Sequence, residues 1–252
     1  MKGDPGIVMR RRSPLEVLDL GMALVRADAG RIAMATLPAW ALVAAVAAVL
    51  WTLSGWGAVA VAVVLGRICQ VPTLFYASDR SAGNPQPVSQ RRVARAVLSL
   101  VPQAALHGTL SLFAAVIPPA VIYVWGRAYF VAEVVVLERP EAGEWGRIGA
   151  LAASGSGQVV AARLLGLAVE TWAMVAAMMM GEFVMGTLLG LGQPFGVWWA
   201  GDPSPFLILG SLAAQPALAA ARFAAYLDVR TRRECLDAWF TLWAASNAAG
   251  PG

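Results

Sequence analysis

Long uninterrupted apolar stretches constrain this chain more than any other feature of its sequence. A helix needs about 20 apolar residues to cross the ~30 Å hydrocarbon core of a bilayer. Six stretches approach or exceed that length: 32–53, 57–77, 96–117, 120–137, 163–191 and 206–227. Only 13% of the residues are charged, whereas soluble domains carry about 25%. The sequence therefore predicts an all-α fold, a polytopic membrane bundle of six transmembrane helices.

Lysine and arginine residues are distributed asymmetrically around these stretches. With a cytoplasmic N-terminus, the external connectors would be 52–57, 118–119 and 191–205, and none contains a basic residue. This is the positive-inside pattern, and it predicts a bacterial cytoplasmic (inner) membrane protein with both termini in the cytoplasm. We attribute the net charge of +4 to a cytoplasmic face that contacts anionic lipid headgroups, rather than to nucleic-acid binding.

Amphipathic segments flank the predicted bundle at both ends. Ser13-Pro14-Leu15-Glu16 has the pattern of a capping box with proline at the first helical position. The helix that follows either lies in the membrane interface or packs against the cytoplasmic end of the bundle. The chain then divides into a cytoplasmic segment with this helix (1–31), a six-helix domain (32–229) and a cytoplasmic amphipathic segment (230–252).

One arginine inside each even-numbered span indicates an internal repeat. These arginines are Arg67, Arg127 and Arg222, and the first two follow a glycine. Acidic and basic residues at the cytoplasmic ends of the same spans continue the pattern: Asp79, Arg80, Glu138, Arg139, Asp228 and Arg230. The spacing predicts a helical hairpin used three times, with these end residues on the cytoplasmic face.

Two motifs in the second half of the chain carry a family resemblance. The first is RAYFVAEVVVLER at 127–139, followed by Arg147 and the run SGSG at 154–157; the second is YLDVRTRRECLD at 226–237. In both, the chain resembles bacterial six-span proteins of the glycerophosphoryl diester phosphodiesterase membrane-domain family. The resemblance covers about residues 120–240. It implies a fold and a membrane location rather than an activity, since no polar segment is long enough for the phosphodiesterase barrel of some relatives.

Patterns typical of catalytic or metal sites are weak in this sequence. His107, the only histidine, lies in the third span with Ser111 one turn later. No Gly-x-Ser-x-Gly motif or orienting acid accompanies the pair, so we interpret His107 as a structural histidine. Cys69 and Cys235 lie far apart without a Cys/His cluster. We therefore expect no metal, no cofactor and no enzyme activity.

Ionisable residues inside the predicted spans are the best functional lead. Each costs roughly 2.5–3.5 kcal/mol or more at a helix centre, so each needs a partner or water. The predicted intramembrane polar core consists of Arg67, His107, Arg127, Glu133, Glu170 and Arg222. We expect Arg127, Arg222 and Glu170 to face the bundle interior, with at least one arginine hydrogen-bonded to Glu170. Replacing Glu170 with alanine would then strand a buried arginine.

Two functions of different classes follow from these patterns. The weak catalytic patterns, the basic face and the amphipathic ends favour a non-enzymatic membrane subunit that anchors or organises a partner complex. Its partners would be other proteins or further copies of this chain. The intramembrane charges instead favour a small-solute transporter or lipid-handling protein with an Arg/Glu polar core. The second function predicts a polar cavity inside the bundle, whereas a dry, closed bundle counts against it.

Overall fold

A computed structural model describes residues 13–81, 89–100, 129–138, 144–153, 156–192, 194–195 and 201–248. Within these ranges the chain forms helices and turns, without a strand. The α-helices are α1 (Pro14–Ala27), α2 (Ala29–Trp51), α3 (Gly55–Gly66), α4 (Gln70–Ser81), α7 (Val131–Glu133), α8 (Glu144–Ala153), α9 (Ser156–Phe183) and α10 (Pro205–Ala248). A 3-10 turn, η1 (Arg67–Cys69), joins α3 to α4, and the π-helical segments η2 (Val134–Glu138) and η3 (Val184–Leu188) continue α7 and α9. Residues 90–100 are also helical.

Four helical stretches in the described part are long and apolar enough to cross a membrane. They are Ala29–Trp51, Gly55–Ser81, Gly157–Leu188 and Pro205–Arg232. These correspond to the first, second, fifth and sixth predicted spans. Most of the third predicted span, and the first half of the fourth, lie outside the described residues. The all-helical fold and these four stretches are compatible with a membrane protein.

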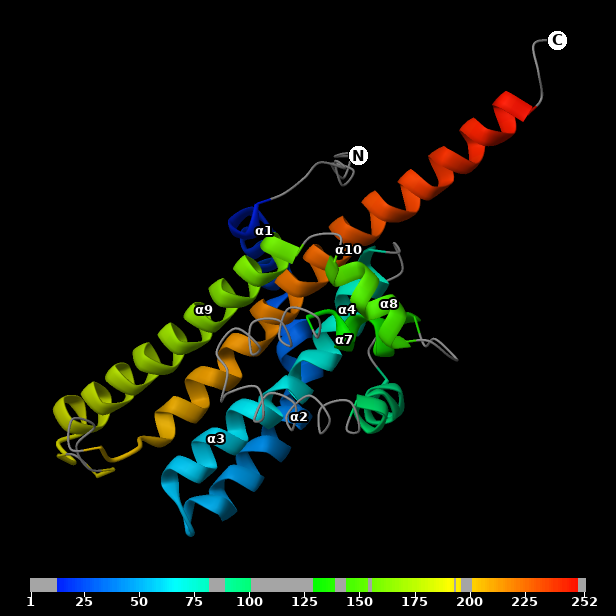
Figure 1. Ribbon diagram of the computed structural model, residues 1–252. Helices are drawn as coiled ribbons and strands as arrows, with labels where there is room; N and C mark the ends of the chain where they lie inside the picture. The colour runs from blue at the N-terminus through cyan, green and yellow to red at the C-terminus, as the bar shows by residue number, and fades with distance from the viewer. Residues whose placement is uncertain are drawn as a thin grey trace, which may run out of the picture.

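The two helices α2 and α3 form a tight antiparallel hairpin (Figure 1). Ser54 begins α3 by accepting a hydrogen bond from the Gly57 backbone N–H at 3.1 Å, so the chain reverses within a few residues. Small residues, including Ala47, Ala58 and Ala62, are buried in the core cluster that the hairpin shares with α10. Small side chains let two membrane helices approach closely.

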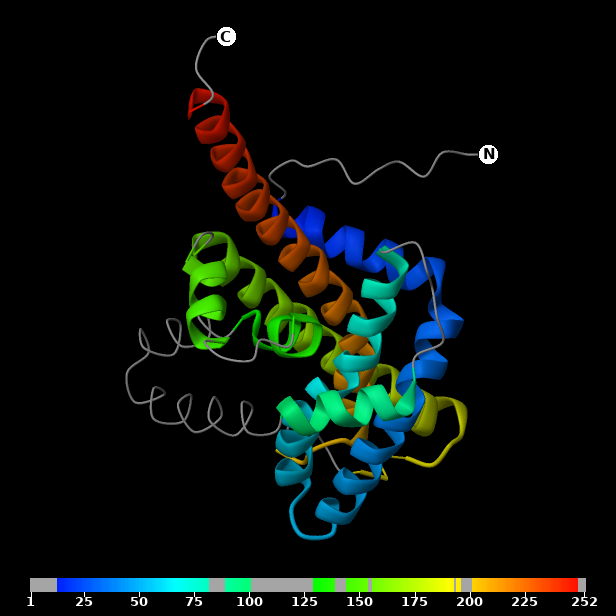
Figure 2. The same cartoon turned by 90° about the vertical axis from the view of Figure 1, so that its right-hand side faces the viewer.

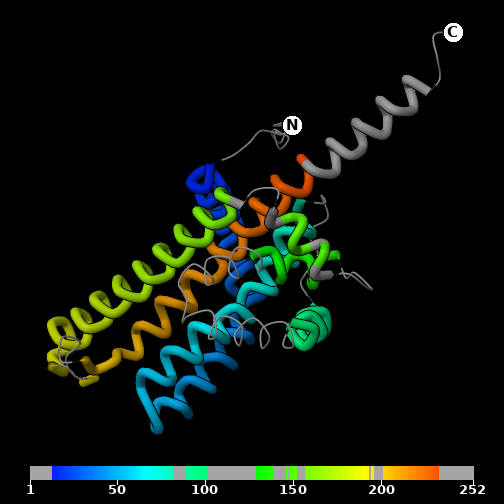
Figure 3. Tube along the Cα trace, in the orientation of Figure 1, coloured from blue at the N-terminus to red at the C-terminus, as the bar shows by residue number. Residues whose placement is uncertain are grey.

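Helix α10 is the central element of the bundle. In the membrane-length stretch of α10, 83% of the most apolar 18-residue segment is buried inside the protein. The corresponding share for the stretch in α9 is 6%. Helices α1, α3, α4 and α9 all pack against α10, as the two cartoon views show (Figures 1 and 2). The outer face of α9, with Trp172, Met179 and Phe183, is exposed and apolar, the kind of surface that lipid covers. Figure 3 shows α9 running beside α10.

The N-terminal helix α1 packs against the bundle. The predicted capping box is confirmed, because the Ser13 hydroxyl accepts from the Glu16 N–H and Glu16 accepts from the Ser13 N–H. Val17 is buried against α10, and Gly21 lies so close that an added Cβ would be 2.5 Å from the Ala221 nitrogen. Of the two placements that the sequence leaves open, the structure has α1 packed against the end of the bundle. The predicted C-terminal segment continues α10 without a break as far as Ala248.

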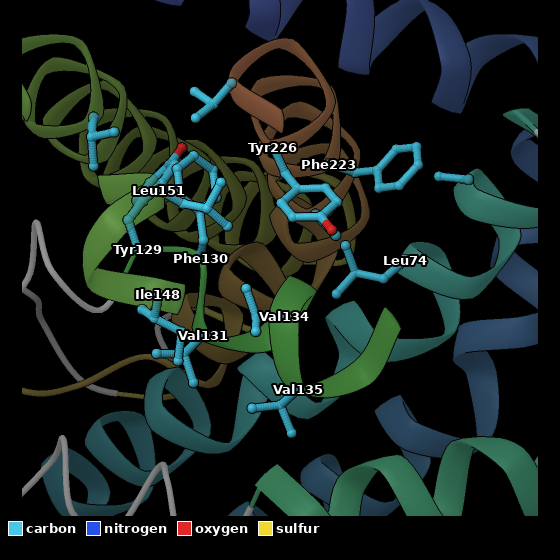
Figure 4. Close-up of a cluster of buried hydrophobic side chains, with 14 residues drawn as sticks. Leu74, Tyr129, Phe130, Val131, Val134, Val135, Ile148, Leu151, Phe223 and Tyr226 are labelled. Carbon is cyan, nitrogen blue, oxygen red and sulfur yellow. The ribbon is translucent and has the colours of Figure 1, made fainter. Parts of the chain in front are cut away.

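The largest core cluster joins α10 to the short elements around α7 (Figure 4). Phe223 and Tyr226 from α10 meet Phe130 just before α7, and Leu74 of α4 completes the contact. The Phe130 and Tyr226 ring centroids are 6.1 Å apart in a tilted arrangement. This packing fixes α7 against the middle of α10 and so positions the polar side chains described next.

Candidate functional site

An ion pair between Arg222 and Glu133 is buried inside the bundle. Glu133, on α7, is fully buried. The guanidinium of Arg222, on α10, donates to both carboxylate oxygens of Glu133, from Nε and Nη2 at 3.0 Å each. This two-bond geometry is the strongest form of an arginine–carboxylate pair. The Nη1 atom of Arg222 donates to Gln70 at 2.7 Å, so the cation is well satisfied.

A chain of hydrogen bonds continues from this ion pair to α9. The side-chain amide nitrogen of Gln70 donates to the side-chain oxygen Oε1 of Gln215 at 2.6 Å. The side-chain amide nitrogen of Gln215 in turn donates to the Glu170 carboxylate at 2.9 Å. Glu170 also accepts from the Ser211 hydroxyl at 2.8 Å. We call this set the polar layer: Gln70, Glu133, Glu170, Ser211, Gln215 and Arg222. The polar layer connects α4, α7, α9 and α10 through side chains that would otherwise be costly to bury.

Helix geometry explains how α10 contributes three members of the polar layer. Ser211, Gln215 and Arg222 are separated by four and seven residues, which places them on one face of a helix. Gln70 begins α4 immediately after the 3-10 turn and three residues after Arg67. Sequence reasoning missed three members of the polar layer: Gln70, Ser211 and Gln215. The available signal was their helical spacing, with Gln70 three residues after Arg67, and Ser211 and Gln215 eleven and seven residues before Arg222.

A small cavity of about 40 Å³ lies beside the polar layer. It has room for about three water molecules. The described residues that line it include three arginines, Arg67, Arg163 and Arg222, and one acid, Glu170. The charge of Arg67 is repelled by Arg222 and attracted by Glu170. With three arginines and one acid among its described lining residues, the cavity wall is electropositive.

Arg67 occupies an unusual position in this wall. It lies 12 residues into Gly55–Ser81, about 18 Å along the helix from its Gly55 end. Its side chain is exposed, and it forms no hydrogen bond or ion pair with any residue of the described part. Arginine cannot lose its proton in a protein, so a cation in the middle of a membrane-length helix requires an anion or water if that helix crosses a bilayer.

The predicted polar core is brought together only in part. Glu133, Glu170 and Arg222 belong to the polar layer, and Arg67 lines the adjoining cavity. The expected arginine contact to Glu170 is not made by Arg222, since Arg222 pairs with Glu133, while Glu170 takes hydrogen bonds from Gln215 and Ser211. Removing Glu170 would thus take an acceptor from the Ser211 hydroxyl and from the Gln215 amide, not from Arg222, and the Gln215 amide would keep its bond to the Ser211 backbone carbonyl at 3.0 Å.

Two predicted core residues, His107 and Arg127, lie outside the described residues. The predicted contact between Arg127 and Glu170 stays a prediction.

The residues predicted on the cytoplasmic face form ion pairs that mostly connect different elements. Asp79 pairs with Arg92 at 3.1 Å, and Arg80 pairs with Asp28 at 2.7 Å. Nearer the end of the membrane-length part of α10, three further contacts occur: Arg232 with Asp228 at 2.6 Å, Arg230 with Glu138 at 3.9 Å, and the Tyr226 hydroxyl donating to Glu138. Arg139 lies outside the described residues.

Comparison with known proteins gave no match to this chain. No protein-family model matches it, and neither the curated proteins nor the solved structures include a significant match. The resemblance to the glycerophosphoryl diester phosphodiesterase membrane domain stays a prediction.

Proposed function

We propose that this protein is a non-enzymatic integral membrane protein that binds a small anionic group beside its polar layer. It would do so in handling an anionic solute or a lipid. The observation that carries the proposal is Arg67, a cation at mid-span without a hydrogen-bonded partner among the described residues, facing a cavity that Arg163 and Arg222 also line.

Charge balance supports an anionic ligand. Glu133 already neutralises Arg222, and Glu170 already accepts two hydrogen bonds from neutral side chains. Among the described residues, the three arginines of the wall face two acids, Glu133 and Glu170, so one positive charge is left that an incoming anion would offset. Guanidinium groups present planar pairs of donors that match carboxylate and phosphate oxygens, and such bonds are strong away from bulk water.

The alternative function is a membrane subunit that anchors or organises a partner complex. The observation that favours it is the exposed apolar face of α9, around Trp172 and Met179, which a partner helix or second copy could cover in place of lipid. A subunit of this kind needs no ligand at Arg67. The binding experiment described below therefore separates the two functions.

The topology we propose has six spans in the bacterial cytoplasmic membrane, a hairpin used three times, and both termini in the cytoplasm. Of the connectors that the charge asymmetry assigns to the outside, 52–57 and the described part of 191–205 meet at one end of the bundle. The Trp56 indole donates to the Gly201 carbonyl oxygen at 2.7 Å, and Gly55 lies against Pro203. Helix α1 lies at the opposite end (Figure 1). The first and last connectors lie on the same side of a membrane only if the chain has an even number of spans, so their meeting at one end supports an even number.

Cysteine labelling tests this orientation. In a chain whose Cys69 and Cys235 are replaced by alanine, Asp202→Cys should react with a membrane-impermeant maleimide added to intact cells. The control variant Ser81→Cys, exposed at the other end of a span, should react only after the cells are permeabilised. The reverse pattern would invert the proposed topology.

Arg67→Gln tests the anion site. We expect phosphate-bearing ligands to raise the melting temperature of the detergent-solubilised protein, because binding at about 100 times the dissociation constant stabilises by roughly 2.7 kcal/mol. The two probes are inorganic phosphate and dioctanoyl phosphatidic acid, each titrated at constant ionic strength. Arg67→Gln should weaken binding about tenfold to a hundredfold, since it removes a charge-assisted contact of roughly 1.5–3 kcal/mol.

The matched control for this experiment is Arg31→Gln. Arg31 lies exposed in the first turn of α2, so the charge change is the same but the cavity is untouched. Binding by Arg31→Gln should equal that of the unmodified chain. If neither probe produces a shift that depends on Arg67, the proposed function is wrong.

A further inference from the structure

A second cavity lies next to the first, beneath α1. It has a volume of about 30 Å³. Four residues line both cavities: Pro14, Val17, Tyr129 and Ala162. Shared walls place the two cavities side by side, with Val17 of α1 on one side of the junction and Ala162 of α9 on another.

The second cavity leads towards the α1 end of the bundle. Its wall includes Asp228 and Arg232, which form an ion pair at 2.6 Å. Arg232 lies ten residues after Arg222 on α10, a distance of about 15 Å along the helix. The two cavities together therefore extend from the polar layer to the bundle end that the proposed topology places at the cytoplasm.

The first cavity has a polar side and an apolar side. Its polar side carries the arginines and Glu170, whereas aliphatic residues of α1, α9 and α10, among them Leu18, Leu165 and Leu218, form the rest. The outer surface of α1 exposes Leu15 and Leu20. A helix with such an apolar outer surface fits the headgroup level of a bilayer, where lipids are its neighbours.

We propose that the anion is the phosphate group of a membrane lipid, which reaches Arg67 from the α1 end of the bundle through the junction at Ala162. This inference rests on the proposed function and names its ligand and route. The first cavity has room for one phosphate group but not for a large organic solute, since it holds about three water molecules. The acyl chains stay against the aliphatic residues of α1 and α9, which offer nothing to a free inorganic ion.

Binding of three probes to the purified full chain in mild detergent tests the ligand. Dioctanoyl phosphatidic acid should raise the melting temperature in an Arg67-dependent manner. Inorganic phosphate should require at least a hundredfold higher concentration for the same shift. Dioctanoylglycerol, which has the same chains without phosphate, should produce no Arg67-dependent shift.

The variant Ala162→Phe tests the route, because a phenyl ring at this position would fill the junction between the cavities. Phosphatidic acid binding should weaken at least tenfold. Ala161→Phe is the matched control: the neighbouring alanine is exposed and lines neither cavity, so binding should stay within twofold. If Ala162→Phe gives no cooperative melting transition, Ala162→Leu replaces it, with at least a threefold loss expected.

The outcomes separate this inference from the function on which it rests. Inorganic phosphate acting as strongly as phosphatidic acid, with the same dependence on Arg67, overturns the lipid assignment but supports the anion site. Equal effects of dioctanoylglycerol and phosphatidic acid overturn the role of the phosphate. Full phosphatidic acid binding by a folded Ala162 variant overturns the route. No Arg67-dependent effect of any probe overturns both proposals.

Discussion

Glu133→Leu is expected to destabilise the folded protein by about 3–5 kcal/mol, the cost of removing one partner of a buried ion pair. Glu133 is fully buried and accepts two hydrogen bonds from Arg222 at 3.0 Å. Once the carboxylate is gone, Arg222 keeps its charge, and its described partners are reduced to the Gln70 hydrogen bond and the Tyr129 ring, whose centroid is 5.9 Å away. Unfolding in mixed micelles with increasing dodecyl sulfate, followed by tryptophan fluorescence, measures the change.

A double variant shows whether the loss arises from the stranded charge. Glu133→Leu combined with Arg222→Leu removes both ions, and replacing a buried pair by apolar residues is often close to neutral. We therefore expect the double variant to be more stable than Glu133→Leu alone. Asp79→Leu is the comparison, because it breaks an ion pair with Arg92 that is partly exposed. It should lower the free energy of unfolding by about 1 kcal/mol or less. Strictly additive losses in the double variant would contradict the pair as the cause.

The membrane-length helices could be predicted from the sequence because few structures accommodate 20 consecutive apolar residues. Four predicted spans agree with membrane-length stretches of the structure to within a few residues at most ends. The largest boundary difference is at Arg163, which the sequence placed at the start of the fifth span. In the structure α9 begins at Ser156, and Arg163 lies inside it on the cavity wall. An arginine can lie within a span when the surrounding helices provide a polar cavity, and that cavity is a product of tertiary packing.

The members of the site were easier to predict than their partners. An ionisable residue in an apolar run is conspicuous, and Arg67, Glu133, Glu170 and Arg222 all lie in or beside the polar layer. Counting residues along a helix estimates the depth of a side chain, but it does not give the rotation of the helix about its axis. Glu133 and Arg222 are 89 residues apart in sequence, so only the packing of α7 on α10 brings them together.

Gly210→Ala is expected to destabilise the contact between α9 and α10 by about 1–3 kcal/mol, the usual cost of overpacking. A Cβ at Gly210 would overlap the carbonyl oxygen of Ala173 and lie 2.6 Å from the Met174 Cα. Both are backbone atoms of α9, so no side-chain rotation relieves the clash and the whole helix must move. The free energy of unfolding in mixed micelles measures the loss.

Gly166→Ala is the matched control, because it adds the same methyl group to α9 where the nearest atom is a Leu218 side-chain carbon at an ordinary 3.7 Å. It should be neutral or stabilising by up to about 1 kcal/mol, the helix propensity gained over glycine.

The Gly210 clash also has a consequence for binding. Ala173 lies three residues after Glu170, so moving α9 away from α10 lengthens the hydrogen bonds that Ser211 and Gln215 donate to Glu170. Gly210→Ala should therefore weaken Arg67-dependent binding of phosphatidic acid relative to the unmodified chain; binding equal to that of the unmodified chain would mean that the anion site does not depend on the contact between these two helices.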